Sequence, residues 1–290
     1  MSTNDAFQIR RAGVMGWPVD HSLSPVVHGY WLDQLQVRGE YVHIPVPPEE
    51  FEAKLRNLKT DGFVGANVTV PHKEAALAAV DNAHPLAQRI GAVNTVVVFE
   101  DGTLYGFNTD GFGFLENLKA GHEGFDPADG PAVILGAGGA ARAVVAALLD
   151  AGAPEVRILN RTRERAEEVA AAVEQSGSGE IIVGDWDGRA DYLDGAHLLA
   201  NTTTLGMKGQ RELELDLSCL PKTALVNDIV YAPLMTDLLG RAQARGNPVV
   251  DGLGMLLHQA RPGFESWFGP MPDVTDDLRK KVLAAAGIQA

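Results

Sequence analysis

A glycine-rich turn between an apolar run and a helix-like run constrains the fold of this chain more than any other feature. The turn covers residues 136–141 and reads GAGGAA, which is the spacing G-x-G-x-x-A. Apolar residues 132–135 come directly before it, and the helix-like residues 142–149 come directly after it. In such a strand–turn–helix unit, the first glycine allows the tight turn and the second lets the backbone approach a pyrophosphate. The small third residue lets the helix pack close to the strand, and the helix N-terminus favours the anion. The pattern predicts a dinucleotide site, with an ordinary tight turn as the alternative.

The end of the next predicted strand, residues 156–159, indicates which dinucleotide binds. Sites for NAD usually place an acidic residue there, where it accepts a hydrogen bond from the ribose 2′-hydroxyl. This chain instead has Asn160, Arg161 and Thr162, with Arg163 and Arg165 close behind. A guanidinium pairs with a 2′-phosphate, whereas a carboxylate would repel it. The sequence therefore favours NADP over NAD, and a solvated basic helix start is the alternative.

Length, charge and cysteine content limit the class of protein. The 290 residues suggest two domains. The net charge of −14 argues against nucleic acid or an anionic membrane as a general partner, although a local basic pocket can still bind a small anion. Cys219 is the only cysteine, which fits the reducing cytoplasm. The polar start of the chain carries no signal-peptide pattern, and no apolar stretch approaches membrane-spanning length. We expect a cytoplasmic protein.

Hydrophobic patterning predicts two α/β domains. Residues 1–109 alternate strands and helices, which predicts a mostly parallel α/β domain that binds substrate. Residues 110–252 contain six strand candidates in the pattern of a doubly wound, Rossmann-type sheet. Two helical stretches without a following strand lie within 253–290, and we expect them to return to the first domain and complete it. The expected strands cover 10–16, 41–46, 63–70, 93–99, 103–107, 132–135, 156–159, 180–183, 197–200, 224–227 and 248–251; the expected helices cover 25–35, 48–58, 73–80, 111–122, 255–267 and 275–286.

Two serines before the first predicted helix form a candidate carboxylate site. Ser22 and Ser24 precede Pro25, so two hydroxyls and a helix N-terminus come together. This combination suits a carboxylate. The alternative is a plain N-cap, which accounts for Ser24 and leaves Ser22 unexplained.

Lys73 and Asp110 are the candidates for proton transfer. Lys73 begins a helix directly after a strand that ends at Pro71. A helix start favours the neutral form of a lysine, and such a lysine can exchange a proton with an alcohol near neutral pH. Asp110 lies at the junction of the two predicted domains, where a carboxylate and Lys73 could hold one hydroxyl. A surface ion pair of Lys73 and an N-cap role for Asp110 are the alternatives. Asn94 is a neutral polar group at the same end of the sheet, and His72 is expected to point away from Lys73.

The sequence shows no metal-ligand spacing among its histidines and its single cysteine. We therefore expect no metal.

Further motifs occur in a fixed order along nearly the whole chain. They are residues 22–25, 67–74, 91–95, 108–111, 136–142, 160–162, 201–207, 228–233 and 252–262. This ordered set resembles the shikimate dehydrogenases of the aromatic amino-acid pathway, in the shikimate/quinate dehydrogenase family.

The resemblance implies an oxidoreductase that interconverts 3-dehydroshikimate and shikimate with NADP. It implies that Lys73 and Asp110 form the catalytic pair; which of them donates the proton stays open. It also implies carboxylate binding by Ser22, Ser24 and Tyr231, and hydroxyl binding by Thr69, Asn94 and Gln259. The implied cofactor residues are Gly136, Ala137, Gly138, Gly139, Ala140, Asn160, Arg161, Thr162, Arg165, Ile229, Gly252 and Met255.

Two alternatives to this function remain at the level of the sequence. One is a quinate/shikimate dehydrogenase that uses NAD or both cofactors, against which Arg161 argues. The other is a catalytically silent NADPH-binding regulator, against which the joint presence of Lys73 and Asp110 argues. A homodimer is one assembly state that the sequence leaves open. Residues 184–194 and the tail after Trp267 carry no assigned role.

Overall fold

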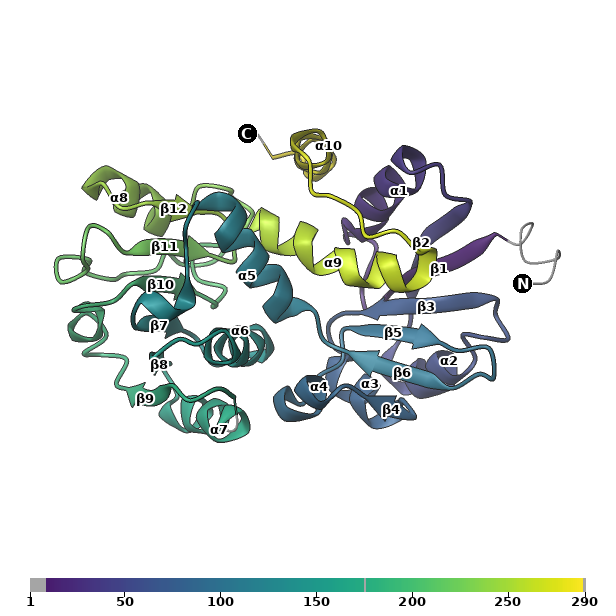
Figure 1. Ribbon diagram of the computed structural model, residues 1–290, viewed down its shortest axis with the longest axis horizontal. Coiled ribbons are helices and arrows are strands. Elements are labelled where there is room, and N and C mark those ends of the chain that lie inside the picture. The colour runs from purple at the N-terminus through teal and green to yellow at the C-terminus, as the bar shows by residue number, and fades with distance from the viewer. Residues whose placement is uncertain (1–8, 175, 289–290) are drawn as a thin grey trace. The chain divides into compact units, whose positions relative to one another are not determined.

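The chain folds into two compact units, each built on its own six-stranded sheet (Figure 1). The computed structural model describes residues 9–174 and 176–288, so the polar start of the chain lies outside the described residues. The first unit extends to Thr109 and takes up the chain again at Ala260; the second unit runs from Asp110 to Gln259.

The sheet of the first unit is mixed, with more parallel than antiparallel neighbours. Its strand order is β2-β1-β3-β5-β6-β4. Strand β1 is parallel to β2 and β3, β4 is parallel to β6, and β5 is antiparallel to both β3 and β6. Strands β5 and β6 form an antiparallel hairpin, and Thr103 N donates to the Asp101 carboxylate (2.8 Å) in its turn. The bounds are β1 (Arg10–Gly16), β2 (Gly39–Pro45), β3 (Phe63–Val68), β4 (Asn82–Ala83), β5 (Thr95–Val98) and β6 (Leu104–Phe107).

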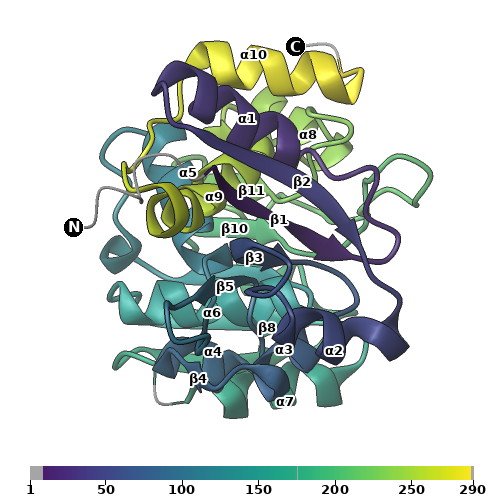
Figure 2. The ribbon, with the colours of Figure 1, turned by 90° about the vertical axis from the view of Figure 1, so that its right-hand side faces the viewer.

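Helices cover both faces of this first sheet (Figure 2). One face packs apolar side chains of α2, α3 and α4 against strand residues in a single buried cluster. The other face carries α1, with α10 beside it. The predicted helix over 48–58 begins instead as a 3-10 turn, and α4 and β4 were not predicted. The bounds are α1 (Ser24–Gln34), η2 (Pro48–Glu50), α2 (Phe51–Arg56), α3 (Lys73–Ala79), α4 (Pro85–Ile90), α9 (Leu253–Phe268, of which the first unit holds the part from Ala260) and α10 (Asp276–Ala286).

The C-terminal segment packs into the first unit through aromatic contacts. Trp267 of α9 lies on the sheet, and its Nε1 donates to Val96 O (3.0 Å). A Cβ at Gly65 would lie 2.1 Å from that nitrogen, so only glycine lets the indole approach β3 so closely. Trp31 of α1 donates from Nε1 to Asp273 O (2.9 Å), which ties down the chain ahead of α10. The end of α9 and the segment that leads into α10 therefore belong to the first unit.

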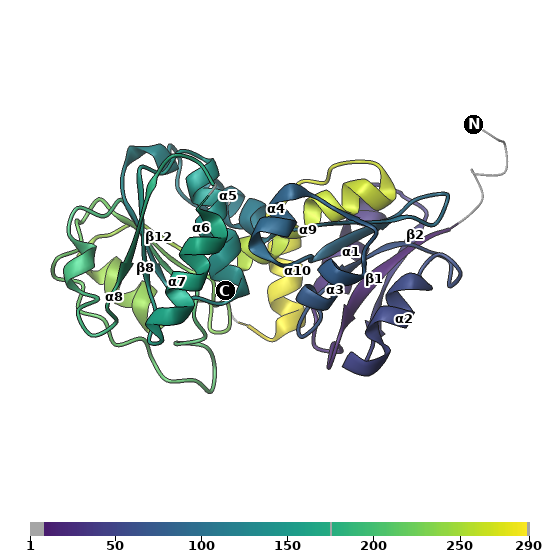
Figure 3. The same cartoon turned by 90° about the horizontal axis from the view of Figure 1, so that it is seen from below.

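The second unit is a doubly wound parallel sheet, as predicted. Its order is β12-β11-β10-β7-β8-β9, and every paired neighbour is parallel. Helices α6 and α7 lie on one face and α8 on the other (Figure 3), which follows from right-handed crossovers that run outward in both directions from β7 and β10. The bounds are α5 (Asp110–Gly121), η3 (Pro127–Asp129), β7 (Ala132–Leu135), α6 (Gly139–Asp150), β8 (Glu155–Leu159), α7 (Arg163–Val173), β9 (Glu180–Gly184), η4 (Asp191–Leu193), β10 (Leu198–Asn201), β11 (Leu225–Asp228), α8 (Asp237–Arg245) and β12 (Val249–Val250).

Burial on both faces explains the apolar strands of this unit. All residues of β7, β10 and β11 are buried, as expected for a parallel sheet covered by helices on both faces. The direction of winding reverses between β7 and β10, so the crevice for a ligand is expected at the carboxyl ends of these two strands. Among the described residues, no helix combines the length and apolar character needed to cross a membrane.

Candidate functional site

The turn from β7 into α6 has the geometry of an anion site. Gly136 has φ of 111°, a left-handed conformation that favours glycine, and its N–H donates to Leu159 O (2.8 Å). A Cβ at Gly138 or Gly139 would meet nothing within 4 Å, so the space in front of the α6 N-terminus is open. Ala141 is fully buried where the helix packs on the sheet. The open space and the helix N-terminus together suit a pyrophosphate.

A cavity of about 620 Å³ opens at this turn, within the second unit. It brings together six of the predicted cofactor residues with seven that sequence reasoning did not assign to the cofactor. The predicted residues are Gly136, Ala137, Gly138, Asn160, Arg161 and Arg165; the others are Trp186, Thr202, Thr203, Thr204, Leu205, Gln210 and Arg211.

The unassigned part of this cavity comes mainly from the loop after β10. Thr202 donates from its N (2.8 Å) and its Oγ1 (2.7 Å) to Leu135 O at the end of β7. These bonds hold the loop beside the glycine turn, because β10 and β7 are parallel neighbours. In the sequence, this loop is marked by a run of polar residues directly after an apolar strand. The run indicates a cofactor contact only once β10 is known to pair with β7.

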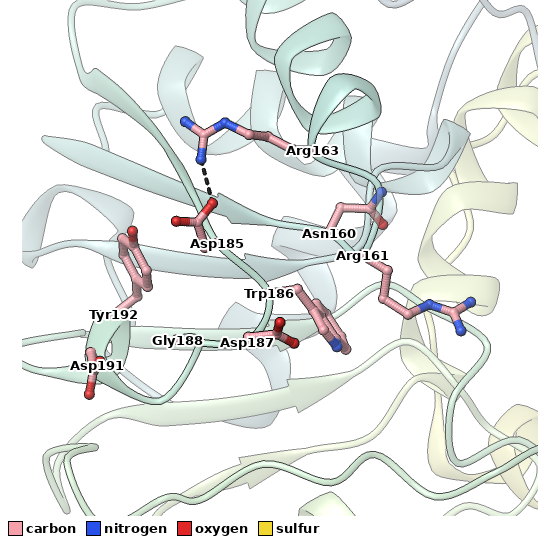
Figure 4. Close-up of a pocket in the computed structure, with 9 residues that line it drawn as sticks. All are labelled: Asn160, Arg161, Arg163, Asp185, Trp186, Asp187, Gly188, Asp191 and Tyr192. Atoms are coloured by element: carbon pink, nitrogen blue, oxygen red, sulfur yellow. Dashed lines mark hydrogen bonds and ion pairs between the residues drawn. The ribbon is translucent and has the colours of Figure 1, made fainter.

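A second cavity, of about 820 Å³, lies beyond the ends of β8 and β9 and shares Asn160, Arg161 and Trp186 with the first (Figure 4). Arg163 is engaged there by Asp185 (2.6 Å) and by Glu167 (2.9 Å). The exposed Arg161 extends away from the Arg163–Asp185 pair (Figure 4).

The remaining predicted cofactor residues do not line either cavity. Thr162 is the N-cap residue of α7, and Gly139 and Ala140 form the first turn of α6. Ile229, Gly252 and Met255 lie around the end of β11 and the start of α9. A Cβ at Gly252 would lie 2.2 Å from Ile229 O, so the two segments approach as closely as glycine allows.

The two predicted carboxylate-binding serines lie together at the start of α1. The Ser22 hydroxyl donates to Ser24 Oγ (3.2 Å) and accepts from Ser24 N (3.3 Å). The alternative of Ser24 as an N-cap is wrong: Leu23 is the cap residue, without a side-chain cap bond, and Ser24 is the first helical residue. Leu23 has helical backbone angles, so the helix start moves one residue back and Ser22 reaches the Ser24 N–H.

Asn94 anchors the polar end of the first sheet. Its Oδ1 accepts from Thr109 N (3.0 Å) and Thr95 Oγ1 (2.8 Å), and it is nearly fully buried. The backbone before it is tied to the start of α3, because Val93 N donates to Lys73 O (3.0 Å). Lys73 and Asn94 are thus held close in the backbone of one unit.

Thr69 and His72 flank Pro71 between β3 and α3. Thr69 is half-buried, and its N–H donates to Met15 O (2.9 Å) at the end of β1. The ring of His72 is buried against Phe51, and its Nε2 lies 2.7 Å from Val46 O. His72 therefore serves packing inside the first unit.

Three predicted substrate or catalytic residues belong to the second unit. Asp110 is the first residue of α5 and is 8% exposed. Burial raises the pKa of the Tyr231 hydroxyl. The Gln259 side chain donates from Nε2 to Leu256 O (3.1 Å). In the described part of the chain, no group of three or more His, Cys, Asp and Glu side chains is placed to hold a metal ion.

A doubly wound parallel sheet with a glycine turn, an open helix N-terminus and a basic strand end defines a dinucleotide-binding protein, with a separate α/β unit as in two-domain dehydrogenases. Comparison with known families refines this class. Residues 14–96 match the shikimate dehydrogenase substrate binding domain, and residues 121–193 match the shikimate / quinate 5-dehydrogenase family.

Individual relatives agree with the family matches. The chain is 61% identical over 275 residues to the NADP(+) shikimate dehydrogenase of Paramagnetospirillum magneticum, covering 95% of this chain and 98% of that one. The shikimate 5-dehydrogenase of Thermus thermophilus, solved with NADP(H) and shikimate, is 40% identical with a TM-score of 0.81, covering 96% and 99% of the two chains. The quinate dehydrogenase of Corynebacterium glutamicum, solved with NAD, is 30% identical with a TM-score of 0.88, covering 95% and 99%. The chain belongs to the shikimate dehydrogenase family, and the predicted family and fold class are confirmed.

Proposed function

We propose that this chain reduces 3-dehydroshikimate to shikimate with NADPH, reversibly, in aromatic amino-acid biosynthesis. The observation that carries the proposal is the 61% identity, over nearly all of both chains, to a relative named as an NADP(+) shikimate dehydrogenase. The predicted activity and cofactor are confirmed by such relatives, and these favour neither an NAD-linked quinate enzyme nor a silent regulator.

The second unit of the chain fits NADP in two places. The open space before Gly138 and Gly139 suits the pyrophosphate, and the exposed Arg161 suits the 2′-phosphate. When bound, NADPH supplies the hydride for the carbonyl carbon. The chain's own task is then to hold the substrate and to move one proton at the carbonyl oxygen.

Lys73 and Asp110 are the residues proposed for that proton. A carboxylate beside a lysine orients the ammonium and the hydroxyl, and either group can exchange the proton with the substrate oxygen. Ser22, Ser24 and Tyr231 are proposed for the substrate carboxylate, and Thr69, Asn94 and Gln259 for its hydroxyls. The hydrogen bond between the two serine hydroxyls supports this, since both oxygens lie at one helix start.

The proposal extends to the setting of the enzyme. It acts in the cytoplasm on a small molecule, without nucleic acid or membrane as a partner, and a homodimer is the assembly to test. Sedimentation velocity measures the assembly state directly.

Single and double variants of the catalytic pair test the assigned roles. We expect Lys73→Ala to lower kcat by roughly a hundredfold to ten-thousandfold, the usual effect of a positioned acid or base. Asp110→Asn should be similarly damaging, and the double variant little worse than either, because the pair works as a unit. Steady-state kinetics gives kcat, and calorimetry gives the Kd for NADP, which Lys73→Ala should leave unchanged. Independent, multiplicative losses in the double variant would show that the two residues do not share one proton transfer.

A further inference from the structure

A buried carboxylate at the end of β11 lies outside every role assigned so far. Asp228 has no exposed surface. Its Oδ1 accepts from Asn201 Nδ2 (3.0 Å) and from Val230 N (3.0 Å), and its Oδ2 accepts from Thr236 Oγ1 (2.8 Å). Burying a carboxylate costs free energy unless it is well hydrogen-bonded, and burial raises the pKa of Asp228 despite these bonds. A chain that needed only packing here could use an apolar residue at lower cost.

The bond to Asn201 fixes the orientation of that side-chain amide. Asn201 ends β10 and is also fully buried. Its Nδ2 donates to Asp228 and to Leu205 O (3.0 Å). Its Oδ1 is thereby directed at Thr203, from which it accepts both the N–H (3.0 Å) and the hydroxyl (2.7 Å).

The amide in turn fixes the loop after β10. The Thr203 hydroxyl accepts from Leu205 N (3.0 Å), so the turn over residues 203–205 is closed by Asn201 from both ends. This loop forms one wall of the 620 Å³ cavity. It also abuts the glycine turn: a Cβ at Gly136 would lie 2.9 Å from Thr202 Oγ1 and 3.0 Å from Thr203 Cγ2. A displacement of the loop would therefore change the space above the proposed pyrophosphate site.

We infer that Asp228 is a positioning residue for the cofactor, acting through Asn201 on the loop 202–205. The inference rests on the proposed NADP site but assigns a residue that touches no part of either cavity. A helix-cap role alone does not account for the arrangement: Thr236 caps α8 through Leu239 N (3.4 Å), and only one of the three bonds to Asp228 involves that cap.

Four single variants and one double variant of the full-length protein separate positioning from stability. Asp228→Ala and Asn201→Ala remove the two ends of the same bond, and both together complete a double-mutant cycle. Asp228→Asn keeps an oxygen that can accept from Asn201 and Val230. Asn247→Ala is the matched control: Asn247 is buried and donates to Pro221 O (2.8 Å) and Ala224 O (3.0 Å), at the amino end of β11, away from the cavity. Titration calorimetry with NADP gives Kd, and steady-state kinetics gives KM for each substrate.

We expect Asp228→Ala and Asn201→Ala each to raise the Kd and KM for NADP by about tenfold or more, as for a lost buried hydrogen bond. The KM for shikimate should change by less than about twofold, and the double variant should match the singles. Asp228→Asn should stay within about threefold of the parent, and Asn247→Ala should leave the Kd for NADP unchanged even if it lowers the melting temperature.

The inference is overturned if Asn201→Ala leaves the Kd for NADP unchanged. This test does not depend on Asp228→Ala, so it applies even if that variant does not fold. Equal weakening by Asn247→Ala would also contradict it, as would a loss of affinity in Asp228→Asn as large as that in Asp228→Ala. An enzyme that reduces NADP with shikimate normally but shows none of these Kd changes refutes the positioning role while leaving the proposed function intact.

Discussion

Arg161 and Arg163 stand two positions apart after β8, and the structure gives their charges different surroundings. Arg163 is paired with Asp185 and Glu167, so its charge is largely matched within the protein. Arg161 is exposed, lines both cavities and extends away from that pair (Figure 4). We therefore expect Arg161, rather than Arg163, to set the choice between NADP and NAD.

Replacing Arg161 by alanine should raise the KM for NADP by about tenfold to a hundredfold and change the KM for NAD far less, because only NADP carries the 2′-phosphate. Arg163→Ala is the matched control and should have a small effect on both. Steady-state kinetics with each cofactor makes the comparison. Equal loss with NADP and NAD would rule out the phosphate contact.

His28 is a second residue whose environment has a measurable consequence. Its ring is fully buried and stacks on Tyr41 with centroids 3.9 Å apart. Burial lowers the pKa of His28 from 6.5 to about 3, with the Asn67 side chain acting in the opposite direction. The folded protein therefore holds this imidazole neutral where the unfolded chain would protonate it.

The stability of the protein should fall on acidification because of His28. The His28 imidazole binds a proton below pH 6.5 in the unfolded chain, but only near pH 3 in the folded chain. The contribution of neutral His28 to the free energy of unfolding is therefore fully present above pH 6.5 and is lost as the pH falls toward 3. Between pH 7 and pH 5 the parent should lose about 2 kcal/mol more than His28→Phe. Urea unfolding of both proteins at both pH values measures this difference in the free energy of unfolding. The carboxylates titrate alike in the two proteins, so their contribution cancels. Parallel losses in the two proteins would show that His28 is not held neutral.

Two glycines in the turn between β7 and α6 differ in what they contribute: one is needed for folding, and the other leaves space for a ligand. Gly136 adopts a left-handed φ and abuts Thr202, so folding requires glycine there. Gly138 has φ of −91° and ψ of −174°, which any residue adopts, and open space where its Cβ would be. Folding does not require glycine at 138.

Gly138→Ala should thus fold with a melting temperature close to that of the parent and bind NADP at least about tenfold more weakly, because the methyl group takes up space for the pyrophosphate. Binding of shikimate should not change. Gly136→Ala, the comparison variant, should lower the melting temperature. Calorimetry gives the Kd for NADP, and thermal unfolding gives the melting temperature. If Gly138→Ala binds NADP as tightly as the parent, the pyrophosphate does not lie at this turn.

Elements with a strong local hydrophobic pattern could be predicted from the sequence, whereas elements without such a pattern could not. The apolar strand 132–135 and its following helix are set by local sequence and were predicted within a few residues. Strand β4 has only two residues and exists through its pairing with β6, so no local pattern marks it. The loop 202–205 was not assigned to the cofactor, because its place beside Gly136 depends on β10 pairing with β7.

For the molecule as a whole, the alternation of strands and helices predicted two α/β sheets, and the order of the motifs along the chain indicated the family. The sequence also predicted that the chain would return to the first unit after the second, and the contacts of Trp267 and Trp31 hold the C-terminal segment there. Strand order is set by packing between distant segments. The bond between Asp228 and Asn201, at the ends of β11 and β10 beside the 620 Å³ cavity, therefore became visible only in the structure.

The proposed reaction of this protein is the NADP-linked interconversion of shikimate and 3-dehydroshikimate. The most direct measurement follows NADPH absorbance when the purified protein is mixed with shikimate and NADP, in parallel with quinate and with NAD. We expect NADP reduction that depends on shikimate, with a kcat/KM for shikimate and NADP well above that for quinate or for NAD. No reduction of NADP by shikimate, or a faster reaction with quinate and NAD, would contradict it.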